Sequence, residues 1–145
     1  MTSVCVDASL AAKWVLPEPD RDIAQALYEE WRAAILEIIG PPLLFAEITN
    51  ILRRNVVRDV IIPAEALTAE AVFRRLGVRV ASPDDLYREA LILAQRFDLP
   101  AAYDTQYLAV AQIEGCDFWT ADERLFNRVS TELPWVQLLG RRATE

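Results

Sequence analysis

The sequence predicts a single α/β domain in which a central parallel sheet of about five strands is flanked by helices on both faces. Short apolar, β-prone runs alternate with longer segments of helical periodicity, which is the pattern of parallel strands joined by crossover helices. A length of 145 residues fits one domain, and 53% hydrophobic residues are enough to form its core. We therefore expect one domain over residues 1–140 and a short polar tail over residues 141–145.

Five short apolar runs account for the strands. They span residues 3–6, 35–39, 78–81, 116–120 and 135–139. Glu37 interrupts the second run, so the pattern leaves the start of this strand open. Cys5 and Cys116 each lie within such a run and are predicted to be buried free thiols, since the chain has no C-x-x-C pair.

Seven helices are predicted around these strands. They span residues 10–15, 20–34, 43–58, 63–76, 82–97 (with residue 84 as the alternative start), 102–114 and 123–129. Ser9 is expected to cap the first helix. Gly77 is well placed for the left-handed conformation that often follows the last turn of a helix. The alternation of strand and helix therefore continues along nearly the whole chain.

The composition excludes several classes of active site. The chain has no histidine, which excludes histidine-ligated zinc, Ser-His-Asp triads and an imidazole base. Any chemistry must therefore depend on carboxylates. A net charge of −7 argues against binding of nucleic acid through bulk electrostatics, although divalent cations held by clustered acids would reverse the charge that a phosphate meets.

No segment has the character of a membrane or export signal. Uninterrupted apolar runs stay well short of the roughly 18 residues that a membrane span requires. The start of the sequence, MTSVCVDASLAAKW, has no basic stretch followed by a long apolar one. We expect a cytoplasmic protein with no membrane partner.

Two aspartates directly follow predicted strands. Asp7 ends the first strand and Asp122 follows the fourth. Ligands of parallel α/β sheets bind outside the carboxyl ends of the strands, so both side chains are expected at the same rim. Each aspartate also has a simpler explanation, because aspartate is a preferred N-cap residue.

Two further acids interrupt apolar helix faces. Glu47 is the only charge on the stripe formed by residues 43, 44, 47, 48, 51 and 52, and Asn50, Arg53 and Arg54 are assigned to the opposite face. Asp104 shares a face with Tyr107 and is expected to point toward the core. Alternatively, Glu47 reaches water or an arginine, and the helix N-terminus stabilises Asp104. If all four acids converge, a hard divalent cation with oxygen ligands would relieve their repulsion.

Four segments carry a resemblance to a known family. They are residues 4–9 (VCVDAS), 45–54 (FAEITNILRR), 103–111 (YDTQYLAVA) and 119–125 (WTADERL). Together they look like the successive motifs of PIN domains, and their order and spacing most resemble VapC toxins of type II toxin–antitoxin modules. The resemblance covers nearly the whole chain. It implies a parallel sheet flanked by helices, divalent-metal ribonuclease activity, a homodimer and a cognate VapB-type antitoxin.

The resemblance also assigns roles to individual residues. Asp7, Asp104 and Asp122 match the acids that hold Mg²⁺ or Mn²⁺, while Glu47 matches an acid that either ligates the metal or acts as a general base. Ser9 and Thr120 match small hydroxyl residues that support the site, and Asn127 lies where the last motif often has a polar residue.

The function expected from these residues is metal-assisted hydrolysis of RNA phosphodiesters. Arg124 and Arg128, four residues apart, could contact the RNA backbone or merely solvate a helix face. A housekeeping RNA-processing nuclease and a non-catalytic PIN scaffold remain alternatives. A haloacid-dehalogenase-like phosphatase is disfavoured because Ser9 stands where its second aspartate would be, and a receiver domain because Lys13 is the sole lysine.

Overall fold

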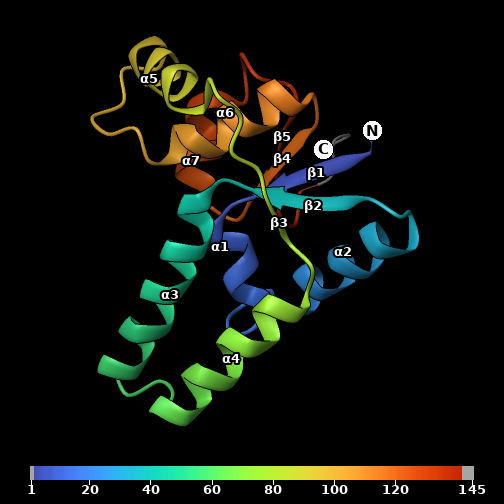
Figure 1. Ribbon diagram of the computed structural model, residues 1–145, viewed down its shortest axis with the longest axis vertical. Coiled ribbons are helices and arrows are strands. Elements are labelled where there is room, and N and C mark those ends of the chain that lie inside the picture. The colour runs from blue at the N-terminus through green and yellow to red at the C-terminus, as the bar shows by residue number, and fades with distance from the viewer. Residues whose placement is uncertain (1, 142–145) are drawn as a thin grey trace.

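Five parallel strands form the centre of the protein in the computed structural model, which describes residues 2–141 (Figure 1). Their order across the sheet is β3-β2-β1-β4-β5. The strands are β1 (Ser3–Val6), β2 (Glu37–Gly40), β3 (Arg79–Val80), β4 (Asp117–Thr120) and β5 (Val136–Leu138). Residues 142–145 of the predicted tail lie outside the described residues.

Strand β1 occupies the middle of the sheet and is buried along its whole length. A strand covered on both faces is typically apolar throughout, and the sequence SVCV fits this position. The register pairs Val6 of β1 with Trp119 of β4. The residues that follow these two strands are therefore neighbours at the carboxyl edge of the sheet.

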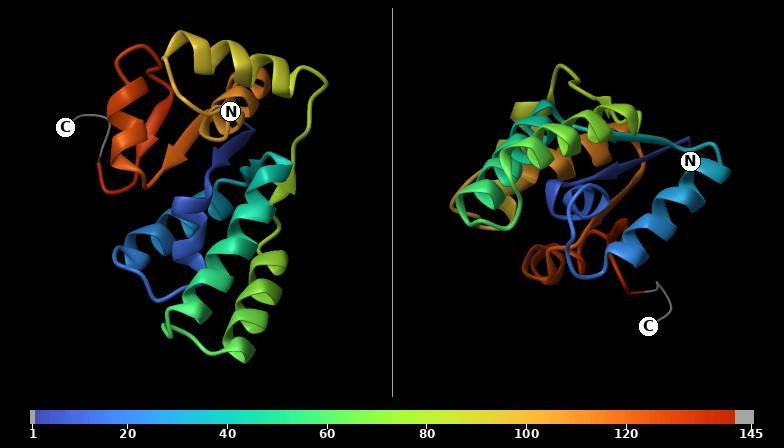
Figure 2. Two further views of the ribbon diagram at one scale, coloured as in Figure 1. Left: turned by 90° about the vertical axis from the view of Figure 1, so that its left-hand side faces the viewer. Right: turned by 90° about the horizontal axis from the view of Figure 1, so that it is seen from below.

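Seven α-helices and one 3₁₀ turn connect the strands. They are α1 (Ala8–Ala11), η1 (Ala12–Trp14), α2 (Arg21–Ala33), α3 (Pro42–Val57), α4 (Pro63–Arg75), α5 (Leu86–Arg96), α6 (Asp104–Glu114) and α7 (Glu123–Val129). Helices lie on both sides of the sheet, and α3 and α4 form an antiparallel hairpin that projects beyond it (Figure 2). The predicted parallel sheet with helices on both faces is confirmed. No helix of the described residues is long and apolar enough to cross a bilayer.

The core fixes α6 against the centre of the sheet. The ring of Tyr107 stacks on Phe118 of β4, with 6.1 Å between centroids, and the Cys5 thiol donates to the Tyr107 carbonyl oxygen at 3.6 Å. Tyr107 is 1% exposed and Phe118 is fully buried. The first turn of α6 is thereby held at the carboxyl edge of β1 and β4. Cys5 and Cys116 are buried free thiols, as predicted.

Several element boundaries differ from the predictions. Asp7, not Ser9, caps the first helix, because the Asp7 Oδ1 atom accepts the hydrogen bond from the Leu10 amide. Strand β2 starts later than residue 35 because the backbone of Ile35 is left-handed, with φ of 57°. Strand β3 has only two residues. Helix α5 starts at Leu86, since the chain first makes a turn in which the Leu86 amide donates to the Pro83 carbonyl.

Candidate active site

Asp7 lies buried at the carboxyl end of β1, with only 6% of its surface exposed. Its Oδ1 accepts hydrogen bonds from the Ser9 hydroxyl at 2.7 Å and the Leu10 amide at 3.1 Å. Its Oδ2 accepts a hydrogen bond from the Thr120 hydroxyl. Both carboxylate oxygens are therefore held in one orientation, which combines the helix-cap role with a fixed position at the sheet edge.

Ser9 and Thr120 connect Asp7 to the loop that follows β4. Their hydroxyl oxygens lie 3.3 Å apart. The Ser9 hydroxyl also accepts from the Ala121 amide at 3.0 Å, and the Thr120 hydroxyl accepts from the Asp122 amide at 2.9 Å. The two hydroxyl residues predicted to support the site thus link the two strand-end aspartates.

Asp122 and Asp104 each begin a helix at this edge. Asp122 caps α7, and its Oδ1 accepts from the amides of Arg124 at 3.0 Å and Leu125 at 3.2 Å. Asp104 is the first residue of α6. The prediction that Asp104 points toward the core is wrong: the residue is exposed, because the buried face of α6 begins at Thr105 and Asp104 lies beyond it, at the mouth of a cleft.

Burial and neighbouring acids raise the pKa values of Asp7 and Asp104. Burial raises the pKa of Asp7 from 3.8 to about 6, although hydrogen bonds from Thr120, Ser9 and Leu10 oppose the shift and Asp104 adds to it. The pKa of Asp104 is also raised, first by loss of solvation and then by the negative charges of Asp122 and Glu47. The acids therefore repel one another, as expected if they converge on one cleft.

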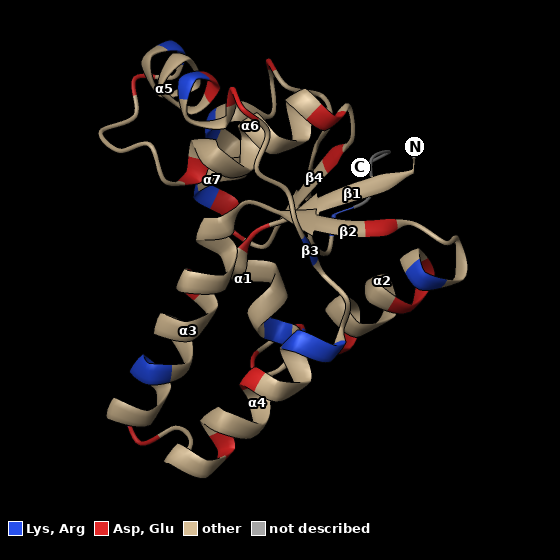
Figure 3. Ribbon diagram, viewed as in Figure 1, with Lys and Arg blue, Asp and Glu red and all other residues tan. Residues whose placement is uncertain are grey.

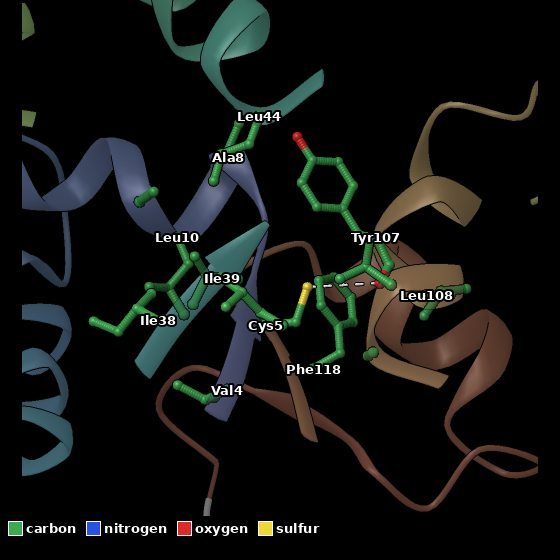
Figure 4. Packing of buried hydrophobic residues seen from close by; sticks show 14 of the residues in the cluster. Val4, Cys5, Ala8, Leu10, Ile38, Ile39, Leu44, Tyr107, Leu108 and Phe118 are labelled. Atoms are coloured by element: carbon green, nitrogen blue, oxygen red, sulfur yellow. Dashed lines mark hydrogen bonds between the residues drawn. The ribbon is translucent and has the colours of Figure 1, made fainter. Parts of the chain in front are cut away.

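Glu47 has a hydrogen-bond partner on α6 that the sequence pattern does not predict. The Tyr107 hydroxyl donates a hydrogen bond to Glu47 Oε1, so a tyrosine of α6 meets the half-buried acid of α3. Burial and the neighbouring Glu47 carboxylate raise the pKa of Tyr107, so the phenol remains a donor. Figure 4 shows the hydroxyl pointing away from Phe118, toward the side on which Leu44 of α3 lies. The signal in the sequence was the polar tip of a tyrosine three residues after Asp104.

All four acids line one cleft with a volume of about 470 Å³. Its α3 wall continues from Glu47 through Ile51 to Arg54 and Arg58. The assignment of Arg54 to the face opposite Glu47 is therefore wrong. Residues seven positions apart on a helix point in nearly the same direction, since two turns take about 7.2 residues.

The comparison that decides the family is a match to the PIN domain over residues 4–132, which is most of the chain. The chain belongs to the PIN domain family. PIN domains are nucleases and generally use divalent metal ions. No curated protein is significantly similar in sequence to this PIN domain.

Solved structures share the fold of this PIN domain. The crystal structure of PAE2754 from Pyrobaculum aerophilum is 23% identical, with a TM-score of 0.62, over 88% of this chain and 86% of that one. The structure of VapC20 from Mycobacterium tuberculosis, described as a sarcin-ricin loop cleaving toxin, is 19% identical, with a TM-score of 0.65, over 90% of this chain and 95% of that one. At these identities the likeness supports the fold alone.

The carboxylate oxygens in the cleft of this PIN domain suit a hard divalent cation as ligands. Both oxygens of Asp104 and the Oδ2 of Asp122 accept no hydrogen bond from the described residues, and both residues line a cleft whose carboxylates repel one another. Carboxylate oxygens are the ligands that Mg²⁺ and Mn²⁺ prefer. Across residues 2–141, however, no three acidic or cysteine side chains are arranged closely enough to form a ready-made metal centre.

Three residues proposed as peripheral members of the site lie outside this cleft. Asn127 and Arg124 are exposed on α7 and do not line it. Arg128 donates through Nη2 to the carbonyl oxygens of Phe97 at 3.1 Å and Asp98 at 3.0 Å. Arg128 therefore connects α7 to the carboxyl end of α5.

Proposed function

We propose that this PIN domain is a divalent-metal-dependent endoribonuclease and the toxin of a VapBC-type toxin–antitoxin module, acting in the cytoplasm. The observation that carries the proposal is the cleft in which four carboxylates, from the ends of β1 and β4 and from α3 and α6, face one another in a protein without histidine. The family match supports the nuclease assignment. The toxin assignment rests on the order and spacing of the motifs, together with the fold shared with VapC20.

Asp7, Asp104 and Asp122 are the residues proposed to hold Mg²⁺ or Mn²⁺. A bound ion would supply charge neutralisation for the scissile phosphate and a more acidic water. Asp7 is oriented for this role by Ser9 and Thr120, and Asp122 by the amides at the start of α7. Hydrogen bonds therefore hold two of the three proposed ligands, Asp7 and Asp122, in one orientation before any ion binds, which lowers the cost of binding.

Glu47 is proposed to act on the water that attacks phosphorus. Tyr107 occupies Oε1 of Glu47, which leaves Oε2 to accept the proton from that water or to serve as a further ligand. In hydrolysis the water oxygen forms a bond to phosphorus and Glu47 Oε2 takes the proton that it releases. The bond to the leaving ribose oxygen breaks, and this oxygen takes a proton from solvent water to become a hydroxyl. The exclusion of an imidazole base leaves a carboxylate as the acceptor.

The substrate and partners follow from the same proposal. RNA binding is expected to depend strongly on the divalent ion because the chain carries a net charge of −7. A VapB-type antitoxin would cover the cleft, and two copies of the chain would form a homodimer. Structured RNA belongs among the substrates tested, since the related fold of VapC20 belongs to a toxin that cleaves the sarcin-ricin loop.

The decisive experiment incubates the purified protein with structured and unstructured RNA in Mg²⁺ or Mn²⁺. Wild-type protein is expected to cleave RNA, while Asp7→Asn, Asp104→Asn and a chelator each abolish cleavage. Cleavage that persists in both variants would mean that another site is responsible. If the wild type cleaves no RNA and metal does not shift its thermal unfolding, the protein is a non-catalytic scaffold and the proposal is wrong.

A separate observation distinguishes a toxin from a housekeeping nuclease. A toxin gene should lie beside a short reading frame that encodes a DNA-binding protein, and co-expression of the two should give a complex that no longer cleaves RNA. Light scattering of the purified chain gives its mass in solution, and the homodimer predicts twice the mass of one chain.

A further inference from the structure

The α3 wall of the cleft carries two arginines, Arg54 and the C-cap residue Arg58, to which neither the family resemblance nor the metal site assigns a role. Glu47, Ile51, Arg54 and Arg58 all line the cleft. Their spacing of four, three and four residues places them in one row along the helix. From Glu47, Arg54 lies about 10 Å and Arg58 about 16 Å further along the helix axis, at 1.5 Å per residue. The row therefore begins at the acids and continues as a basic wall, defined by Arg54 and Arg58.

The fold does not use the charges of this basic wall. No carboxylate oxygen of residues 2–141 lies within 4.0 Å of either guanidinium, and neither guanidinium donates a hydrogen bond to another residue in that part of the chain. Lys13, the third cation of the cleft, is different, because its Nζ donates to the Pro19 carbonyl at 2.8 Å and lies 3.6 Å from Glu18. Arg54 and Arg58 are thus exposed cations with no structural partner among the described residues.

We infer that Arg54 and Arg58 bind backbone phosphates of the RNA strand next to the phosphate that is cleaved. This inference rests on the proposed ribonuclease function and adds a substrate-binding subsite to it. Figure 3 shows basic residues on α3 at a distance from the acidic residues near the carboxyl edge of the sheet. A phosphate at the acids requires a divalent cation, whereas a phosphate further along the strand meets two guanidinium groups directly.

The chemistry of arginine suits this role. The guanidinium is always charged, is weakly hydrated compared with an ammonium, and donates two parallel hydrogen bonds to one phosphate. Backbone contacts of this kind set the register of a nucleic acid without reading its bases. The basic wall would therefore align the RNA strand along α3 and place the scissile bond at Glu47 and the three aspartates.

The test measures binding of a short, fluorescein-labelled single-stranded RNA by fluorescence anisotropy. All proteins carry Glu47→Gln and are measured in Mn²⁺; this change removes the proposed proton acceptor, so that RNA is not consumed, and keeps the three aspartates proposed to hold the metal. The added variants are Arg54→Ala, Arg58→Ala, the double variant and Arg53→Ala. Arg53 is the matched control, because it is an exposed neighbour on α3 that does not line the cleft. Thermal unfolding of each variant confirms that it is folded.

Each cleft arginine removed is expected to weaken binding about tenfold, the effect of losing one hydrogen-bonded contact to a charged group. The slope of log K against log salt should become shallower by about 1.4 in the double variant, at about 0.7 for each lost phosphate contact. Arg53→Ala should change neither quantity. A change in slope reports lost ionic contacts, which a purely structural effect would not produce.

Two results would overturn the inference. One is a double variant that binds RNA with the affinity and salt slope of Arg53→Ala. The other is a double variant that binds RNA normally but no longer binds poly-glutamate, which would assign the arginines to an acidic protein partner. Both results leave cleavage by the wild type unaffected, so they are distinct from a failure of the proposed function, in which the wild type cleaves no RNA.

Discussion

The Tyr107 hydroxyl donates a hydrogen bond to Oε1 of Glu47 and joins α6 to α3 across the base of the cleft. The same tyrosine ring stacks on Phe118 of the central sheet, so the core of the protein positions an acid of the proposed site. A glutamate on a long, flexible side chain would otherwise adopt several rotamers. The contact explains how Glu47 can be half-buried without an arginine or lysine partner among residues 2–141.

Replacing Tyr107 by phenylalanine should therefore slow RNA cleavage while the protein stays folded. We expect kcat to fall about tenfold and KM to change little, since one hydrogen bond to a charged acceptor is worth about 1.5 kcal/mol. Tyr103→Phe is the matched control, because Tyr103 begins the same segment but is exposed. Equal kcat values for the two variants would show that Tyr107 does not position Glu47 for the reaction.

Asp7→Asn should stabilise the metal-free protein at neutral pH even though it removes an acid of the site. The pKa of Asp7 is about 6 in the folded protein and 3.8 ordinarily, so between these values the folded state binds more protons than the unfolded state. Stability must then fall as pH rises from about 4 to above 6. Burying the Asp7 charge costs at most about 3 kcal/mol at neutral pH. Asparagine can still accept the cap hydrogen bond from the Leu10 amide and carries no charge, so it avoids this cost.

The measurement is thermal unfolding in a chelator at pH 7.5 and pH 4.5. Asp7→Asn should raise the Tm by several degrees at pH 7.5, at about 3 °C per kcal/mol for a domain of this size. The gain should shrink at pH 4.5, where wild-type Asp7 is mostly protonated. Asp84→Asn, which changes an exposed aspartate, provides the control. A lower Tm for Asp7→Asn at pH 7.5 would contradict the prediction.

Addition of Mn²⁺ or Mg²⁺ should reverse this order of stabilities. A ligand that binds only the folded state stabilises it by about 2.7 kcal/mol at one hundred times its Kd. We expect the Tm of the wild type to rise with metal concentration and to return to its starting value in excess chelator. Asp7→Asn and Asp104→Asn should show little or no rise. An equal rise in all three proteins would place the metal at another site.

The strand-end acids could be predicted from the sequence, whereas the helix-borne side chains were only partly predictable. The positions of Asp7 and Asp122 at the same edge of the sheet follow from the rule that parallel strands end at one edge. The parallel register of β1 and β4, with Val6 opposite Trp119, confirms that these strands end side by side. Glu47 was recognised as the one charge on an apolar stripe, but its partner comes from an element 60 residues away. Long-range packing of this kind leaves no local trace in the sequence.

Two errors have the same physical origin. Arg54 is assigned to the face opposite Glu47 because the stripe is taken to end at its last apolar residue, although its line continues into the α3–α4 hairpin that projects beyond the sheet, where Arg54 is exposed. Asp104 was assigned to the core because the face of α6 was extended to its first residue, which lies beyond the buried part. Periodicity indicates the direction of a side chain but not where along a helix the packing ends.

Arg128→Ala should destabilise the protein and leave RNA binding unchanged. The Arg128 guanidinium bonds to two carbonyl oxygens at the carboxyl end of α5, so its loss removes charge-assisted hydrogen bonds between two helices. Because the residue is exposed, we expect a loss of only about 1 kcal/mol in the free energy of unfolding, measured in urea. Arg124→Ala is the control, since Arg124 lies on the same helix and its guanidinium has no such bonds among the described residues. Weaker RNA binding by Arg128→Ala at unchanged stability would instead favour the direct RNA contact that the i, i+4 spacing of the two arginines suggests.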